Sequence, residues 1–594
     1  MPPSRLKAII KRIRQSIRED GLLATYGRIR RKLHSKYGAK AFKNAWKLSE
    51  EDKRFQETRK FKHNTLISLL VPVYNTPDLF LREMLDSVLS QTYKNFEVCI
   101  ADGSDEDHPD VGKTILAYAH SDKRIRYEKL SENKGISENT NACIRMAQGE
   151  YFALLDHDDL LHPSALYQMM DAIENTGADF LYSDEATFHR HPKDAYLPHF
   201  KQDFSPDTLR AHNYICHLSV FHRPLLKKAG MFRREFDGSQ DYDLFLRLTE
   251  KANKVVHIPR ILYYWRNHEA SVASDVSAKP YVVKAAMNAL TEHLNRVGLK
   301  GKVLKTTVPS IYRIRYELDE KPLVSILIPS SDHAEVLKRC IDSILEKTTY
   351  PNYEILIVEN NSKQEATFAY YESLKSNSQI QLLHWKGAFN YSALNNFAAD
   401  HAKGEYLLLL NNDTEVITPD WISEMLMFAQ RGDVGAVGAK LYYPDGSVQH
   451  AGIGIGLLTL AGHYHRGFPH DAPGYMGRLQ YQQNVSAVTG ACLLIRAQAY
   501  RELGGMDEAL AVNFNDVDLC MKIREKGLLI VFTPFAELYH HESLSRGVDE
   551  APEKRKRYLQ EEALFRSRWE KHLAAGDPYF SPNLDPLRED FSYR

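Results

Sequence analysis

LISLLVPVYN (residues 66–75) and NFEVCIADGS (residues 95–104) decide the fold, because each is a continuous apolar run that ends in polar residues. The segment between them has helical periodicity, with apolar side chains at Leu81, Leu85 and Val88. Continuous apolar strands separated by helices are typical of a parallel sheet covered on both faces. Ligands bind such sheets beyond the carboxyl ends of the strands. We therefore expect an α/β domain whose site lies where these polar residues meet.

The same order of segments occurs twice. VSILIPSSD (residues 324–332) and NYEILIVENNS (residues 352–362) repeat the two opening strands, and two later pairs keep the order: GEYFALLDHDD (149–159) with GEYLLLLNNDT (404–414), and QDYDLFLRL (240–248) with NDVDLCMKI (515–523). A repeat of this length indicates a duplicated unit. The sequence predicts two copies of one domain at residues 64–300 and 320–548, preceded by residues 1–63 and followed by a helix and an extended tail at residues 549–594.

Charge is unevenly distributed along the 594 residues. The chain has 77 basic and 77 acidic residues, but residues 1–47 hold fourteen Lys/Arg and two acids, which leaves a net charge of −12 on the rest. Apolar residues at helical spacing make this segment a basic amphipathic helix, which either lies on an anionic membrane surface or packs as a solvated helix on its own domain. Few aromatic residues are interleaved with the basic ones, so nucleic-acid binding is not predicted.

The remaining composition favours a globular cytoplasmic protein. Hydrophobic residues make up 43% of the chain, which excludes a disordered protein. The six cysteines are scattered singly, as expected for buried thiols in a reducing compartment. The longest apolar runs are far short of a membrane span, and no secretory signal is evident. We expect a cytoplasmic location, with peripheral attachment to the inner face of the membrane if the basic helix binds lipid.

Aspartates cluster at the end of the strand predicted at residues 151–155. Asp156 and Asp158 form a D-x-D pair, which can bind a divalent cation that also takes phosphate oxygens. Such a triplet alone is weak evidence, because Asp also serves turns and helix caps. Its predicted position beside Asp102, together with QDYD further on, supports a functional site.

The ordered set VPVYN, ADGS, NKGIS, GEYFALLDHDD, QDYDLFLRL and WRNHE resembles glycosyltransferase family 2, over about 480 residues in two copies. The resemblance implies two tandem GT-A domains, which are Rossmann-like folds of nucleotide-diphospho-sugar transferases, and an inverting reaction. It also implies a UDP- or dTDP-sugar donor and Mg²⁺ or Mn²⁺. The doubled arrangement and the tail from Asp577 to Leu584 are similar to bacterial transferases that build O-antigen, capsule or other surface polysaccharides on a glycan or lipid-linked glycan acceptor.

The resemblance assigns roles in the first copy. The nucleotide-sugar would be bound by Pro72, Tyr74, Asn75, Asp102, Lys134, Gly135 and Asp156, the metal by Asp158 and His268, and Asp241 would be the general base. These residue types suit the chemistry, because a carboxylate must take the proton of the attacking hydroxyl while a cation offsets charge on the leaving diphosphate. For Asp243, a charge at a helix N-terminus is favoured over catalysis.

The second copy keeps part of this set. Glu359 replaces Asp102 and Asn411 replaces Asp156, whereas Asp413 is retained for the metal, His541 is matched to His268 with His540 adjacent, and Asp516 is the second general base. IPSSD has lost the tyrosine of VPVYN. This copy is therefore either catalytic or a degenerate scaffold. An extra stretch at residues 452–477 is expected to be a mobile acceptor-side loop with solvated histidines.

The function predicted from the sequence is a metal-assisted, inverting glycosyltransferase with one Asp base in each copy. Three alternatives remain: only one copy is catalytic and the other is a scaffold or glycan-binding domain, the chain is a non-catalytic glycan assembly protein, or it is a sugar-nucleotide pyrophosphorylase. VPVYNTPD lacks the Gly-rich loop that the last alternative needs.

Overall fold

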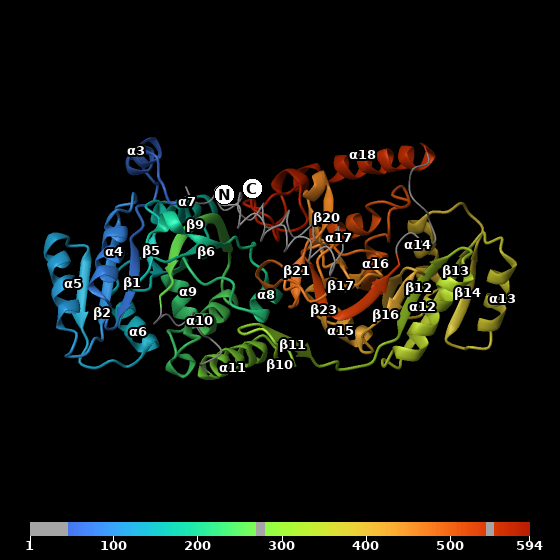
Figure 1. The fold of residues 1–594 in the computed structure, drawn as a ribbon, viewed down its shortest axis with the longest axis horizontal. Coiled ribbons are helices and arrows are strands. Elements are labelled where there is room, and N and C mark those ends of the chain that lie inside the picture. Colours follow the sequence, from blue (N-terminus) through green and yellow to red (C-terminus); the bar gives the residue numbers. More distant parts are fainter. Residues whose placement is uncertain (1–44, 269–279, 542–551) are drawn as a thin grey trace, which may run out of the picture.

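The computed structural model describes residues 45–268, 280–541 and 552–594, and it contains two large sheets side by side (Figure 1). The predicted basic helix lies mostly in residues 1–44, outside the described residues. The described part of the N-terminal segment contains α3 (Glu50–Thr58), which is capped by Ser49 and begins with three acidic residues. No helix in these three ranges has the length and apolar content needed to cross a membrane.

The first unit, called module 1 below, is a nine-stranded sheet with the order β3-β2-β1-β4-β8-β6-β9-β5 and with β7 paired to β6. The elements in chain order are β1 (Ile67–Val73), α4 (Asp78–Leu89), β2 (Phe96–Asp102), α5 (Pro109–Ser121), β3 (Ile125–Lys129), α6 (Ile136–Met146), β4 (Tyr151–Leu154), β5 (Leu160–Leu161), α7 (Ala165–Thr176), β6 (Phe180–Phe188), β7 (Tyr196–His199), α8 (Pro206–Ala211), β8 (Ser219–His222), α9 (Arg223–Ala229), α10 (Gln240–Thr249) and β9 (Val255–Arg266).

The second unit, module 2, has the order β14-β13-β12-β15-β22-β17-β23-β16, with β18 and β21 on its margins. Its elements are β12 (Val324–Ser330), α12 (Ala334–Lys347), β13 (Tyr353–Asn360), α13 (Glu365–Leu374), β14 (Ile380–Trp385), α14 (Tyr391–His401), β15 (Tyr406–Leu410), β16 (Thr414–Val416), α15 (Trp421–Ala429), β17 (Val434–Tyr442), β18 (Val448–His450), β19 (Ile453–Ile455), β20 (Ala461–His463), β21 (Gln483–Val485), β22 (Cys492–Arg496), α16 (Ala497–Glu502), α17 (Asn515–Glu525) and β23 (Leu529–His540).

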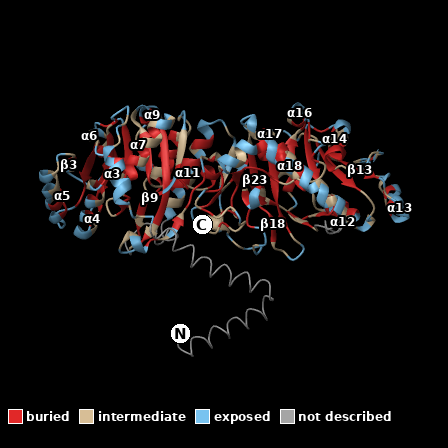
Figure 2. Ribbon diagram, turned by 90° about the horizontal axis from the view of Figure 1, so that it is seen from above, coloured by how far each residue is buried: buried red, intermediate tan, exposed pale blue. Residues whose placement is uncertain are grey.

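The two sheets match strand by strand, which confirms the predicted tandem α/β architecture. Strands β1, β2 and β12 are buried along their whole length, because helices cover both faces of each sheet (Figure 2). The register is also repeated. Val73 is opposite Asp102 in module 1, and Ser330 is opposite Glu359 in module 2. Equivalent positions of the two modules can therefore be assigned from strand pairing.

The modules are joined by α11 (Pro280–Arg296) and the hairpin of β10 (Gly301–Lys305) with β11 (Tyr312–Tyr316). Where α8 faces β21 (Figure 1), Asp207 of module 1 pairs with Arg431 of module 2, with 2.5 Å between Oδ1 and Nη1. Both side chains are almost completely buried. A buried, paired charge at the junction holds the modules in one relative orientation.

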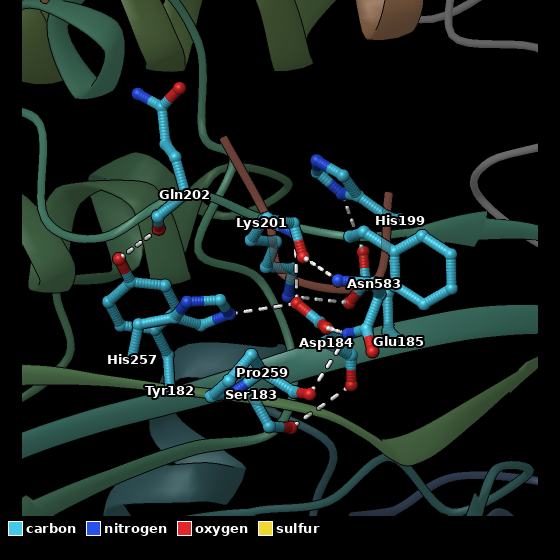
Figure 3. Close-up of polar contacts among 12 residues, drawn as sticks. Tyr182, Ser183, Asp184, Glu185, His199, Lys201, Gln202, His257, Pro259 and Asn583 are labelled. Atoms are coloured by element: carbon cyan, nitrogen blue, oxygen red, sulfur yellow. Dashed lines mark hydrogen bonds and ion pairs between the residues drawn. The ribbon is translucent and has the colours of Figure 1, made fainter. Parts of the chain in front are cut away.

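The C-terminal residues bind both modules. In α18 (Pro552–Ala575), Phe565 and Trp569 are buried against module 2, and the Trp569 indole donates to Asp518 over 2.9 Å. The extended tail then reaches module 1, where Asn583 Nδ2 donates to Asp184 Oδ2 and to the Pro259 carbonyl, both at 2.9 Å (Figure 3). The tail is therefore part of the packed structure.

The stretch at residues 452–477 differs from the expectation of a mobile loop with solvated histidines. It contains the paired strands β19 and β20, and the tail residue Glu589 accepts from the His463 backbone N–H over 2.8 Å. His465 is buried and stacks on Phe591 with ring centroids 4.4 Å apart. Burial lowers the pKa of His463 to about 4. Phe591 of the tail thus covers the His465 ring, His463 is partly buried, and His470 is exposed as expected.

All six cysteines are free thiols, and five of them are buried. This agrees with the expectation of scattered buried thiols.

Candidate active sites

The first polar position of the module 1 site is Asp102 at the end of β2. Its carboxylate is buried and accepts from the Ser104 N–H over 2.8 Å and from the Tyr127 hydroxyl over 2.9 Å, while Lys129 Nζ lies 3.3 Å away. A carboxylate held on several sides keeps one orientation. Asp102 can therefore present a fixed acceptor to a ligand at the sheet edge.

The residues after β1 lie beside Asp102. Asn75 has a positive φ of 48° and exchanges two hydrogen bonds with Asp105, one of them 2.7 Å long. Pro72 is buried within β1, and the Tyr74 side chain is 44% exposed. An exposed ring next to a fixed acceptor can stack on a flat heterocycle.

Gly135 and Lys134 form the turn before α6. A Cβ on Gly135 would stand 2.4 Å from Asp237 Oδ2, and its φ is +94°, so the backbone position requires glycine. Lys134 forms an exposed ion pair with Glu132 over 3.0 Å. The structure thus explains Gly135 by close packing and leaves Lys134 at the rim of the site.

Three aspartates follow β4, and their environments differ. Asp158 Oδ2 lies 2.8 Å from His268 Nε2, so the two residues predicted to bind the metal are in contact. Asp156 is 44% exposed and its Oδ2 is 3.5 Å from His217 Nε2. Asp159 is buried and bound by the Tyr263 hydroxyl over 2.6 Å, and its burial next to the other carboxylates raises its pKa well above the usual value. Asp159 therefore supports the loop, and Asp156 and Asp158 face the site.

Asp241, in the first turn of α10, is the predicted base. Asn213 Nδ2 donates to its Oδ2 over 2.9 Å. Burial raises the pKa of Asp241, partly offset by the nearby imidazole of His217, and the charge of Asp156 also raises it. Asp156, His217 and Asp241 thus form one electrostatic cluster. Asp243 instead points away and is paired with Arg233 and Arg247, so it stabilises the helix.

In module 2, Glu359 occupies the place of Asp102. It accepts from the Ser362 N–H over 2.6 Å, as Asp102 does from Ser104, and His384 Nδ1 lies 3.5 Å from its other oxygen. His384 is opposite Glu359 in the β13–β14 pair, and Lys129 is opposite Asp102 in the β2–β3 pair. Glu359, whose side chain is longer than that of Asp102, is therefore also held by a serine N–H and by a nitrogen-bearing side chain of the next strand.

The imidazole of His540, and not that of His541, lies beside the Asp413 carboxylate, although the His541 backbone N–H donates to the Asp413 carbonyl over 2.9 Å. His540 Nε2 is 3.1 Å from Asp413 Oδ1 and 3.1 Å from Asn411 Nδ2, whereas His541 Nε2 is 3.2 Å from Glu415 Oε2. Successive residues of a strand point to opposite sides, so two neighbouring histidines at the end of β23 cannot both face the site. The predicted match of His541 to His268 therefore differs from the observed contacts.

Asp516 lies at the start of α17, as Asp241 does at the start of α10. Its carboxylate accepts from the Gly490 and Val517 N–H groups, both at 2.8 Å. Burial raises the pKa of Asp516, partly offset by the hydrogen bond from Gly490. Burial therefore raises the pKa of both predicted bases above that of an exposed Asp.

Four residues of these sites were missed by sequence reasoning: Asn213, His217, Tyr391 and Gln449. Tyr391, the first residue of α14, donates its hydroxyl to Asn411 Oδ1 over 3.1 Å, and Gln449 Oε1 is 2.7 Å from His540 Nδ1. All four are far in sequence from the residues they contact. Sequence reasoning could have found Asn213 and His217 only from their position just before β8, which is an inner strand of the sheet.

The donor atoms fit a divalent cation that takes most of its ligands from a substrate. The described residues contain no group of three or more His, Cys, Asp or Glu that could hold a metal ion alone. Asp158 with His268, and Asp413 with His540, each offer a carboxylate oxygen and an imidazole nitrogen within 3.1 Å of each other. Carboxylate ligands suit Mg²⁺ and Mn²⁺, which keep positions open for phosphate oxygens.

Comparison with known proteins gives matches over both modules. The sequence model described as Glycosyl transferase family 2 matches residues 68–230 and 325–504. An uncharacterized protein of Sinorhizobium fredii, y4gI, is 44% identical over 90% of this chain and 59% of its own length. The O-antigen biosynthesis protein RfbC of Myxococcus xanthus is 37% identical over 93% of this chain and 43% of its own length. The chain thus spans about half the length of these relatives.

Among solved structures, the chain is similar to S. aureus TarS 1-349 in complex with UDP-GlcNAc, with 18% identity and a TM-score of 0.31 over 39% of this chain and 72% of that one. It is also similar to GalNAc-T7 with UDP, GalNAc and Mn2+, with 16% identity and a TM-score of 0.36 over 46% of this chain and 53% of that one.

Proposed function

The chain belongs to glycosyl transferase family 2, and from this premise we propose that each of its two GT-A modules transfers a sugar from a nucleotide-sugar donor, with inversion, to a growing surface glycan. The observation that carries the proposal is the repeated pair of a carboxylate at a strand end and an Asp at a helix start. These pairs are Asp158 with Asp241, and Asp413 with Asp516. The relative named for O-antigen biosynthesis supports a polysaccharide or lipid-linked glycan as the acceptor.

Asp241 has the central role in module 1. Its carboxylate takes the proton of the acceptor hydroxyl while that oxygen forms a bond to the anomeric carbon and the bond to the diphosphate breaks. A single displacement of this kind inverts the anomeric configuration. Asn213 donates to Oδ2 of Asp241 and so orients the carboxylate. Burial, which raises the pKa of Asp241, makes it a stronger base than an exposed Asp.

The other residues bind and orient the donor. Asp102 and Glu359 accept a hydrogen bond from the nucleotide base, whose ring stacks near Tyr74 in module 1. Asp158 with His268, and Asp413 with His540, would hold Mg²⁺ or Mn²⁺. When bound, that ion offsets the negative charge that grows on the leaving diphosphate. The donor that we propose is a UDP- or dTDP-linked sugar.

Residues 1–47 carry the proposed attachment to an anionic membrane surface. Fourteen basic residues against two acids would bring the chain to the cytoplasmic leaflet, where lipid-linked acceptors are reached. Deletion of residues 1–47 should move the protein from the membrane fraction to the supernatant, and an unchanged distribution would argue for the solvated-helix alternative.

Nucleotide release tests the proposed activity. The wild type, Asp241→Asn and Asp516→Asn are compared over a panel of UDP- and dTDP-sugars with Mn²⁺, and each substitution is the matched control for the other module. We expect each variant to lose release from one class of donor by about 10²- to 10⁴-fold. If Asp516→Asn changes nothing while Asp241→Asn removes all release, module 2 is a scaffold. If neither changes release, the base assignments are wrong.

A further inference from the structure

The two sites differ most at one place, next to the first aspartate after β4. Strand pairing makes His222 of β8 equivalent to Arg496 of β22, because Tyr151 and Tyr406 face them. Counting back along the chain from this pair, past the start of each strand, His217 of module 1 corresponds to Ala491 of module 2. The same comparison sets Asp156 against Asn411. One module therefore has an acid and an imidazole where the other has an amide and a methyl group.

In module 2 a different residue fills this place. Tyr391 and Ile136 are both the first residues of equivalent helices, α14 and α6. The Tyr391 hydroxyl reaches Asn411 Oδ1 at 3.1 Å and the Gly490 carbonyl at 3.0 Å. The Asn411 amide nitrogen is 3.1 Å from His540. A histidine that lies just before β8 in module 1 and a tyrosine at the start of α14 in module 2 thus stand beside the same position.

Both the backbone and the ring of His217 are held by neighbouring side chains. Its backbone N–H donates to Glu185 Oε2 over 3.1 Å, and its backbone carbonyl accepts from Lys201 Nζ over 2.6 Å. Its ring stacks on Tyr263 with centroids 4.5 Å apart. Lys201 and Glu185 form a buried ion pair beneath it, next to the Asp184–Asn583 contact (Figure 3). The two hydrogen bonds hold the backbone of His217, and the stacking on Tyr263 orients the imidazole.

Neither ring nitrogen of His217 makes a good hydrogen bond within the described residues. Nε2 is 3.5 Å from Asp156 Oδ2, which is longer than a good hydrogen bond, and Nδ1 is buried without a hydrogen-bond partner among the described residues. Asp156 is 44% exposed toward the site. An imidazole donor and a carboxylate acceptor side by side can together bind one sugar hydroxyl. In module 2, Tyr391, Asn411 and His540 bind one another instead.

We propose that His217, together with Asp156, binds a hydroxyl of the transferred sugar in module 1, whereas Tyr391 closes this subsite in module 2, so that the two modules select different donor sugars. The inference rests on the proposed function of module 1 as a transferase. It makes His217 a specificity-determining residue. Module 1 requires a donor with a free hydroxyl at this position, and module 2 does not.

The test measures donor turnover by module 1 alone, in the Asp516→Asn background, with UDP-glucose, UDP-galactose and UDP-N-acetylglucosamine and with deoxy analogues of the best of them. His217→Ala should lower kcat/KM for the hydroxylated donor about 10- to 100-fold, the value of one hydrogen bond to a charged group. It should leave turnover of the matching deoxy donor unchanged. His217→Gln, which keeps a donor, should recover part of the loss.

His222→Ala is the matched control, because His222 lies in the same segment at the end of β8 and stacks on Tyr151 with ring centroids 4.6 Å apart, outside the site. Folding of His217→Ala is expected, since module 2 has Ala491 at this position. An equal loss for hydroxylated and deoxy donors, or no loss, would overturn the inference. If Asp516→Asn alone turns over no donor, or if adding Asp241→Asn to it changes nothing, the proposed function of module 1 fails instead.

Discussion

The junction of the two modules gives the sharpest stability prediction. Asp207 Oδ1 lies 2.5 Å from Arg431 Nη1, and Asn484 of module 2 donates to Asp207 Oδ2 over 2.7 Å. Arg210 is a third partner, 3.3 Å away. Burial acts to raise the pKa of Asp207, but Arg431 and Arg210 outweigh it and hold that pKa below its usual value. The carboxylate is therefore charged, buried and paired at neutral pH.

Asp207→Ala should cost about 3–5 kcal/mol, because it leaves Arg431 and Asn484 buried with fewer partners. Arg431 keeps Asp433 at 2.7 Å, so the cost falls short of a fully orphaned charge. For a unit of about 200 residues this corresponds to a fall in Tm of about 6–20 °C. In differential scanning calorimetry we expect one transition for the wild type and two for Asp207→Ala, because the modules lose part of their shared contact.

Asp420→Ala is the control, since it removes an exposed ion pair with Arg315 that is 3.1 Å long. Its effect should stay within about 0.5 kcal/mol. A Tm for Asp207→Ala within 2 °C of the wild type would refute the reasoning that a buried charge pair joins the modules.

Three further predictions concern module 1. Burial acts to raise the pKa of Glu185, but the charge of Lys201 outweighs it and lowers the pKa to about 2. The ionised Glu185 therefore stabilises the folded state above pH ~4.5, and this stabilisation is lost as the pH falls toward 2. Lys201→Met should remove this contribution from the acid-unfolding curve. Gly135→Ala should lower stability by about 1–3 kcal/mol in chemical denaturation, because its Cβ would meet Asp237 at a positive φ. Asp158→Asn should raise the Mn²⁺ concentration needed for half-maximal nucleotide release at least about tenfold, whereas unchanged metal dependence would exclude Asp158 as a ligand.

Much of the fold could be predicted from the sequence, because the buried strands are continuous apolar runs that can be recognised in it. The apolar runs at residues 66–73 and 324–330 form strands buried along their whole length, and this burial accounts for the continuous apolar pattern that recurs in the two copies. The inner antiparallel strands and the path of the tail were not predicted. Asn583 and Asp184 are 399 residues apart, and no local pattern marks such a contact.

The site was predictable where a residue follows a strand or begins a helix. Asp102, Asp158 and Asp241 occupy such positions, so their neighbourhood follows from the topology. His217 and Tyr391 are brought in by packing across the sheet, and their role depends on distances that sequence spacing does not contain. The choice between His540 and His541 depends on the strand's alternation, which requires knowing where β23 ends.

The most direct test of the central claim, two catalytic modules with one base each, is mass spectrometry of the glycan made on a defined acceptor with both donors present. We predict that the wild type adds two kinds of sugar linkage, that Asp241→Asn and Asp516→Asn each remove a different one, and that the double variant adds neither. A product from either single variant that is identical to the wild-type product in composition and yield would contradict it.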